Sequence, residues 1–106
     1  MVSSRATAQI ALDTAGPRVR ATAPAFTRKR LIALAVTATD LHGVAKYAVT
    51  QTPTPPTADS ALWKPSAPTA FSLAGVPGVK SVYVFAMEAA GNVGSKSVRV
   101  TLDMAA

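Results

Sequence analysis

Apolar residues recur along this chain in short runs, many of them alternating with polar residues, and Pro, Gly, Asp and Asn separate the runs. No stretch keeps helical spacing over three turns, whereas a period of two is the pattern of a half-buried strand. Seven short strands at this spacing are typical of a two-sheet β-sandwich. The predicted strands cover residues 8–12, 18–21, 31–39, 45–51, 69–73, 81–89 and 96–102.

Alternation along a strand also assigns its residues to faces. Three predicted strands carry apolar rows that we expect in the core, namely Ile32, Leu34, Val36 and Ala38; Tyr47 and Val49; and Val98, Val100 and Leu102. The sixth predicted strand is apolar on both faces, so one row must lie in the core and the other must be covered or partly exposed. We expect Tyr83, Phe85 and Met87 to point inward. Val82 and Val84 then point outward and indicate a partner contact.

A proline-rich stretch separates the fourth and fifth predicted strands, because residues 50–68 hold five of the eight prolines. Proline has no amide hydrogen to donate to a sheet, so this stretch should follow a sheet edge. Trp63 lies in its middle and is expected to fold back over the core, since a large aromatic side chain buries more area than its neighbours. The alternative is that Trp63 is a ligand contact on which a sugar ring stacks.

The 106 residues suffice for one compact domain. The chain has no Cys and one His, His42, which excludes disulfides and thiolate metal sites and leaves little for nucleophilic or acid–base catalysis. Asp40 and Glu88 have no evident partner acid or base, and no phosphate-binding glycine loop is present. We therefore expect no enzyme activity and no cofactor. No apolar run is long enough to span a bilayer, so no membrane span is expected.

Eleven basic and five acidic side chains give a net charge of +6, which favours anionic partners. Nucleic-acid binding usually needs aromatic side chains among the cations, and only Phe26 is near the main cluster. We expect a solvated loop and strand edge here, with non-specific binding to nucleic acid as the alternative. The cluster consists of Arg18, Arg20, Arg28, Lys29 and Arg30.

Two turn motifs are more specific than composition. The first is an Asp-x-x-Gly turn from Asp40 to Gly43, and the second has the sequence Glu-Ala-Ala-Gly-Asn from Glu88 to Asn92. Asp and Asn bond their own backbone and Gly supplies positive φ, so both motifs are consistent with hairpin turns.

These turns resemble those of the bacterial immunoglobulin-like or fibronectin-like repeat domains of surface proteins and adhesins. The Leu-Asp-Thr-Ala-Gly-Pro segment at residues 12–17 and the spacing of Tyr47, Trp63 and Tyr83 add to the resemblance, which covers nearly the whole chain. One departure is Glu88, which stands where the repeats carry Asp. The resemblance implies an all-β, immunoglobulin-like two-sheet β-sandwich of about seven strands.

In some of these repeats, acidic turns hold calcium near the junction between domains. Calcium takes six or more oxygen ligands, and this basic chain has few anionic side chains, so plain turn chemistry is the other interpretation. The resemblance implies as calcium ligands Asp13, Asp40, Glu88 and Asn92.

The chain contains one internal match, in which Ile-Ala-Leu-Asp at residues 10–13 aligns with Val-Thr-Leu-Asp at 100–103, ninety residues later. Ninety residues is about one immunoglobulin-like domain. We predict that residues 1–13 are a strand exchanged with a partner or belonging to a preceding repeat, and that 14–106 form the sandwich domain. The alternatives are a chance match and a segment that is the first strand of its own sandwich. The residues expected to contact a partner are Ala8, Ile10 and Leu12.

These features favour a non-catalytic structural or interaction module that assembles with itself or with neighbouring domains. Its expected location is extracellular or on a bacterial cell surface, with a virus particle as the alternative location. The competing function is an accessory domain that binds a glycan or an anionic polymer through Trp63 and the cationic cluster. Resemblance of fold does not decide between them.

Overall fold

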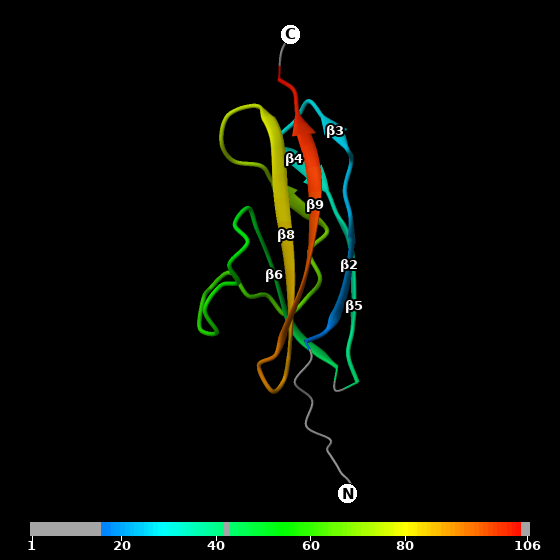
Figure 1. Cartoon of the computed structure of the whole chain (residues 1–106), viewed down its shortest axis with the longest axis vertical. Coiled ribbons are helices and arrows are strands. Elements are labelled where there is room, and N and C mark those ends of the chain that lie inside the picture. The colour runs from blue at the N-terminus through cyan, green and yellow to red at the C-terminus, as the bar shows by residue number, and fades with distance from the viewer. Residues whose placement is uncertain (1–15, 42, 105–106) are drawn as a thin grey trace, which may run out of the picture.

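A computed structural model describes residues 16–41 and 43–104, which form an all-β structure without helices (Figure 1). The all-β prediction is confirmed. Six of the seven predicted strands are present, the strand predicted at 31–39 is divided in two, and the strand predicted at 8–12 lies outside the described residues. The strands are β2 (Arg18–Thr22), β3 (Phe26–Thr27), β4 (Leu31–Ala33), β5 (Ala35–Thr39), β6 (Val44–Thr50), β7 (Ala70–Ser72), β8 (Gly78–Glu88) and β9 (Val93–Leu102).

The largest sheet has four strands in the order β3-β9-β8-β6. β8 and β9 form a long antiparallel hairpin, in which Gly78 pairs with Leu102 at one end and Met87 with Val93 at the other. β3 was not predicted from the sequence. It runs parallel to β9, and the main-chain N–H of Thr101 donates to the carbonyl of Ala25 at 2.9 Å.

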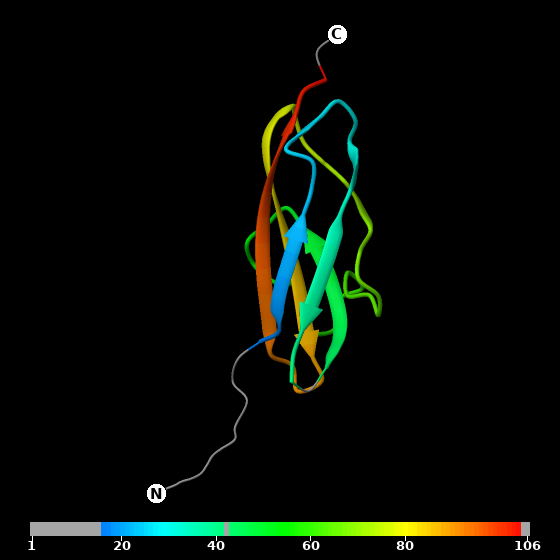
Figure 2. The same ribbon diagram turned by 90° about the vertical axis from the view of Figure 1, so that its right-hand side faces the viewer.

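Two short antiparallel pairs, β2 with β5 and β4 with β7, complete the fold. The strand predicted at 31–39 is divided because it changes partner at Leu34. The main-chain N–H of Leu34 donates to the carbonyl of Thr69 at 2.9 Å, at the end where β7 begins, whereas β5 pairs with β2. Figure 2 shows β2 and β5 side by side in front of the larger sheet.

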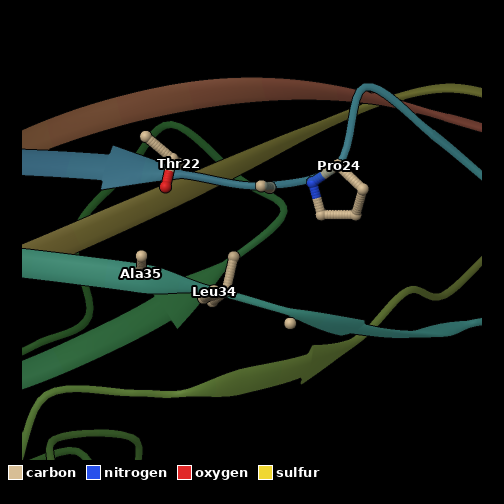
Figure 3. A pocket seen from close by; sticks show the side chains of 6 residues that line it. Thr22, Pro24, Leu34 and Ala35 are labelled. Carbon is tan, nitrogen blue, oxygen red and sulfur yellow. The ribbon is translucent and has the colours of Figure 1, made fainter.

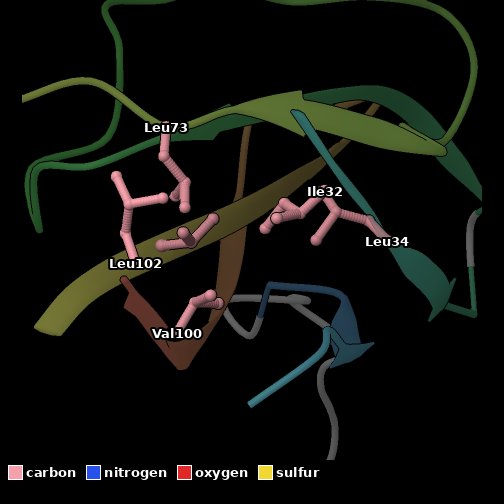
Figure 4. Close-up of a cluster of buried hydrophobic side chains, with 6 residues drawn as sticks. Ile32, Leu34, Leu73, Val100 and Leu102 are labelled. Carbon is pink, nitrogen blue, oxygen red and sulfur yellow. The ribbon is translucent and has the colours of Figure 1, made fainter. Parts of the chain in front are cut away.

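The core lies between the β2–β5 and β4–β7 pairs and the inner face of the four-stranded sheet. Three predicted core rows are confirmed: the row from Ile32 to Ala38, the row of Tyr47 and Val49, and the row from Val98 to Leu102. Each of their residues is buried or packs against buried residues. One cluster contains Ile32, Leu34, Leu73, Val100 and Leu102 (Figure 4), and Val82 belongs to it. A second cluster contains Val19, Ala21, Val84 and Ala86.

The face assignment on β8 was wrong. Val82 and Val84 are 0% exposed and belong to the two core clusters, so they do not form an outward contact surface. Phe85 and Met87 are also buried, but on the opposite face, where Trp63 covers them. Both rows are buried near the C-terminal end of β8, because β8 lies inside the sheet and the segment after β6 folds over its outer face there.

Candidate functional site

Trp63 covers part of the outer face of the four-stranded sheet. It is 7% exposed and packs with Ala48, Phe85 and Met87, so the predicted lid is confirmed. The indole N–H donates to the main-chain carbonyl of Thr57 at 2.9 Å. The indole therefore does not present an open ring face for a sugar, and the ligand role considered for Trp63 is not supported by its position.

The segment that carries Trp63 is fixed to the edge of β6. Tyr47 and Lys64 exchange two main-chain hydrogen bonds of 2.7 Å, and the N–H of Trp63 donates to the carbonyl of Ser60 at 3.4 Å. Further along, the side chain of Gln51 accepts from the N–H of Ala74 at 2.6 Å and donates back to its carbonyl at 3.2 Å. The proline-rich segment thus covers a sheet edge, as its composition predicts.

The acidic turns have the geometry expected of hairpin turns. Gly91 donates its main-chain N–H to the carbonyl of Glu88 at 2.9 Å, and Gly43 donates to the carbonyl of Asp40 at 3.0 Å. Both glycines have positive φ, 80° at Gly43 and 99° at Gly91, a backbone conformation that residues with a Cβ rarely adopt. The carboxylate of Glu88 is buried and accepts from the N–H of Asn92 at 2.8 Å.

The four implied calcium ligands are only partly brought together. Glu88 and Asn92 share one turn, Asp40 lies in the turn that precedes β6, and Asp13 is outside the described residues. Within residues 16–41 and 43–104, no group of three or more His, Cys, Asp or Glu side chains could hold a metal ion. The carboxylate of Glu88 serves its own turn, so the geometry favours the turn role over a ligand role for this residue.

Gly16 and Pro17 pack tightly against the first residues of β9. A Cβ on Gly16 would meet the backbone of Val93, and a Cβ on Gly94 would meet the carbonyl oxygen of Pro17. Pro17 is itself buried. The chain therefore enters the described domain at a fixed point beside the start of β9.

The cations of the first third do not form one patch. Arg18 and Arg20 are exposed on β2, where Arg18 pairs with Thr39, whereas Arg28 and Lys29 are exposed in the turn between β3 and β4. Arg30 has a structural role: its guanidinium donates to the carbonyls of Leu73 at 3.2 Å and Gly75 at 2.8 Å and so joins two neighbouring turns.

Exposed apolar side chains collect at the end of the molecule where β9 finishes, and sequence analysis missed this feature. Phe26 and Val79 both pair with Thr101, one from each side of β9, so the three side chains share the outer face of the sheet. Phe26 is 61% and Val79 is 63% exposed. We call Phe26, Thr101 and Val79 the apolar row. Exposed residues nearby in the same end are Leu31, Val76 and Met104.

A shallow hollow of about 260 Å³ lies where the chain leaves β2 (Figure 3). Thr22, Pro24, Leu34 and Ala35 line it together with Ala23 and Ala33. None of these side chains titrates near neutral pH, so the hollow offers a small apolar surface and no acid–base chemistry.

Comparison with known proteins gives no further identification. The chain matches no protein-family model, and no curated protein or solved structure matches it. Across the described residues, no helix is long and apolar enough to cross a membrane.

Proposed function

We propose that this chain is a non-catalytic structural or interaction module with an immunoglobulin-like two-sheet sandwich fold. Its role is assembly through protein contacts, with copies of itself or with neighbouring domains. The setting we propose is a bacterial cell surface or an extracellular filament, with a virus particle as the alternative.

The strand order supports the immunoglobulin-like assignment. In such sandwiches, strands A, B and E share one sheet and strands C, F and G share the other. Taken in chain order, β2, the consecutive strands β4 and β5, and β7 correspond to A, B and E, whereas β6, β8 and β9 correspond to C, F and G. The core clusters between the two layers are consistent with this arrangement.

The apolar row is the observation that carries the interaction role. Phe26 and Val79 each expose more than half of their side-chain surface on one face, although the same sheet buries Phe85 under Trp63 further along. Exposed apolar groups that lie together mark contact sites more often than isolated ones do. Aromatic and arginine side chains are enriched at such contacts, and Arg28 follows Phe26 closely in the adjoining turn.

Light scattering coupled to size-exclusion chromatography tests this role on the full chain. We expect the apparent molar mass of the protein to rise with protein concentration. The double substitution Phe26→Ser and Val79→Ser should weaken association about tenfold or more. The matched control is Leu41→Ser, because Leu41 is 93% exposed at the other end of the molecule. A chain that stays monomeric at millimolar concentration, or equal loss in the control, contradicts self-assembly through this row.

A second function, binding of an anionic polymer, is supported by Arg28 and Lys29, which are exposed in the same turn. Retention on a heparin column at physiological salt tests it. The Arg28→Ala and Lys29→Ala double variant should elute earlier than the Arg18→Ala and Arg20→Ala variant if the turn is the site. Equal elution of the two variants would contradict a specific site and would indicate that net charge alone causes the retention.

A further inference from the structure

Within residues 16–41 and 43–104, one side of β5 has no strand partner. β5 pairs with β2 from Ala35 to Thr39, and β7 pairs with β4. The last bond on the β7 side is the one from Leu34 to Thr69. Among the residues that the structure describes, no main-chain hydrogen bond reaches residues 35–39 from any strand other than β2. In Figure 2, β2 runs along one side of β5.

The free side of β5 carries no charge, and among the strands of four or more residues this distinguishes it from β2 and β9. Exposed strand edges normally carry charged side chains or are covered, since an open ladder can pair with another chain. β2 carries Arg18 and Arg20, and β9 carries Lys96 and Arg99. β6 is bridged by the segment around Lys64. β5 has the sequence Ala-Val-Thr-Ala-Thr, with neither a charged residue nor a proline.

The core beside this edge is incompletely covered. Val36 and Ala38 face the interior but are only partly buried. They pack in the same cluster as Tyr47 and Val49, and these two residues also line a hollow of about 250 Å³. Most of the remaining lining of this hollow is apolar, including Leu62. A strand added to β5 would place apolar side chains next to Val36 and Ala38 and bury them further.

We infer that residues 8–12 of a second copy of this chain add to the free side of β5 as an antiparallel strand. This inference rests on the proposed function and gives it a defined acceptor. The segment Ala-Gln-Ile-Ala-Leu is five residues long, as β5 is, and like β5 it has no charge. Its alternation places Ile10 and Leu12 on one face, where they would extend the row of Val36 and Ala38, and main-chain bonds would supply most of the affinity.

A second copy suits this role better than the same chain does. Gly16 and Pro17 are fixed beside the start of β9, and β2 then runs antiparallel to β5. A preceding segment that folded back from that point would run opposite to β2 and thus parallel to β5. Parallel pairing is slightly weaker per residue, whereas a segment from another copy can approach in the antiparallel direction.

The absence of cysteine makes a direct test possible, because any disulfide must join introduced residues. Two single variants, Ala11→Cys and Thr37→Cys, are mixed as full chains under a glutathione redox buffer. Both side chains would lie on the outer face of the added strand and of β5, where neighbouring Cβ atoms are close enough for a disulfide. The control replaces Thr37→Cys by Ser97→Cys, which is exposed on β9.

We expect the 11–37 disulfide at a yield at least fivefold above the 11–97 disulfide, and the register can be checked with Gln9→Cys. Equal yields would overturn the inference. A monomer with an internal disulfide, formed by the double variant Ala11→Cys and Thr37→Cys, would assign the segment to its own chain and would also overturn it.

Association measurements separate this inference from the proposed function. Thr37→Lys adds a charge to the open edge at an exposed position, so it should lower association about tenfold while the melting temperature stays unchanged. Ile10→Asp should act in the same direction, and Ser97→Lys should have no effect. Association that is lost on substituting the apolar row but is insensitive to Thr37→Lys and Ile10→Asp would keep the proposed function and refute the strand addition.

Discussion

The indole N–H of Trp63 donates a hydrogen bond of 2.9 Å to the main-chain carbonyl of Thr57, six residues earlier. This bond satisfies the polar atom of a side chain that is otherwise surrounded by Phe85, Met87 and Ala48. A proline-rich connection thereby acquires its own small core on the outer face of the sheet. The connection between β6 and β7 is therefore part of the folded unit.

Substitution Trp63→Ala is expected to lower the free energy of unfolding by about 3 to 5 kcal/mol, the range for removal of a large buried aromatic. Urea unfolding followed by circular dichroism measures it. Trp63→Phe is the control, because it keeps most of the buried area but removes the indole N–H. Loss of the hydrogen bond should lower the free energy of unfolding by about 1 kcal/mol, in addition to the effect of the smaller ring. A Trp63→Ala variant with unchanged stability would contradict the burial of this residue.

Leu73→Ala and Leu41→Ala are the same substitution at opposite extremes of exposure, since Leu73 is 1% and Leu41 is 93% exposed. We expect a loss of about 2 to 5 kcal/mol for Leu73→Ala, which opens a cavity in the core. The loss for Leu41→Ala should stay within about 0.5 kcal/mol. Thermal melting of both variants under one set of conditions gives the comparison, and similar losses would contradict the core assignment.

Gly94→Ala should destabilise the fold by about 1 to 3 kcal/mol, because the new Cβ would collide with the carbonyl of Pro17 and force the backbone apart. Ser95→Ala, at the exposed neighbouring position, is the control and should have little effect. Chemical denaturation measures both. If Gly94→Ala matched the wild type, Gly16 and Pro17 would not be packed against β9 as described.

Calcium is expected to stabilise the isolated chain little, because Glu88 is buried and already accepts from the N–H of Asn92. Melting temperatures in millimolar calcium and in chelator should agree closely. Magnesium at the same concentration controls for ionic strength. A rise with calcium alone would support the calcium site implied by the acidic turns.

Alternation predicted most of the strands and three of the core rows, because apolar and polar residues alternate along a strand that is buried on one face. It could not predict β3, whose two residues are a strand only through pairing with Thr101 far along the chain. The change of strand partner at Leu34 likewise depends on a residue far along the chain, because Leu34 bonds to Thr69. On β8, both rows are apolar, so the local pattern could not decide which row faces the core between the sheets. The packing of Trp63 against Phe85 and Met87 identifies the opposite face.

The apolar row was also beyond local analysis. Phe26 and Val79 are 53 residues apart, and they become neighbours only because β9 lies between their strands. The sequence does contain one signal for the exposure of Val79. Val79 follows the Pro-Gly turn directly, at the very start of a strand, where the sheet is least covered. The free edge of β5 likewise appears only when the short length of β7 is known.

The packing of Gly16 and Pro17 against the start of β9 has a mechanical consequence. The described chain enters beside Val93 and leaves after Leu102, at the two ends of the same strand (Figure 1). A pull on these two points would be directed along β9. The bonds between β3 and β9, from Thr101 to Ala25 and from Asp103 to Thr27, lie across that direction and would be loaded together in shear. The domain would therefore resist stretching better than a hairpin whose bonds open one after another.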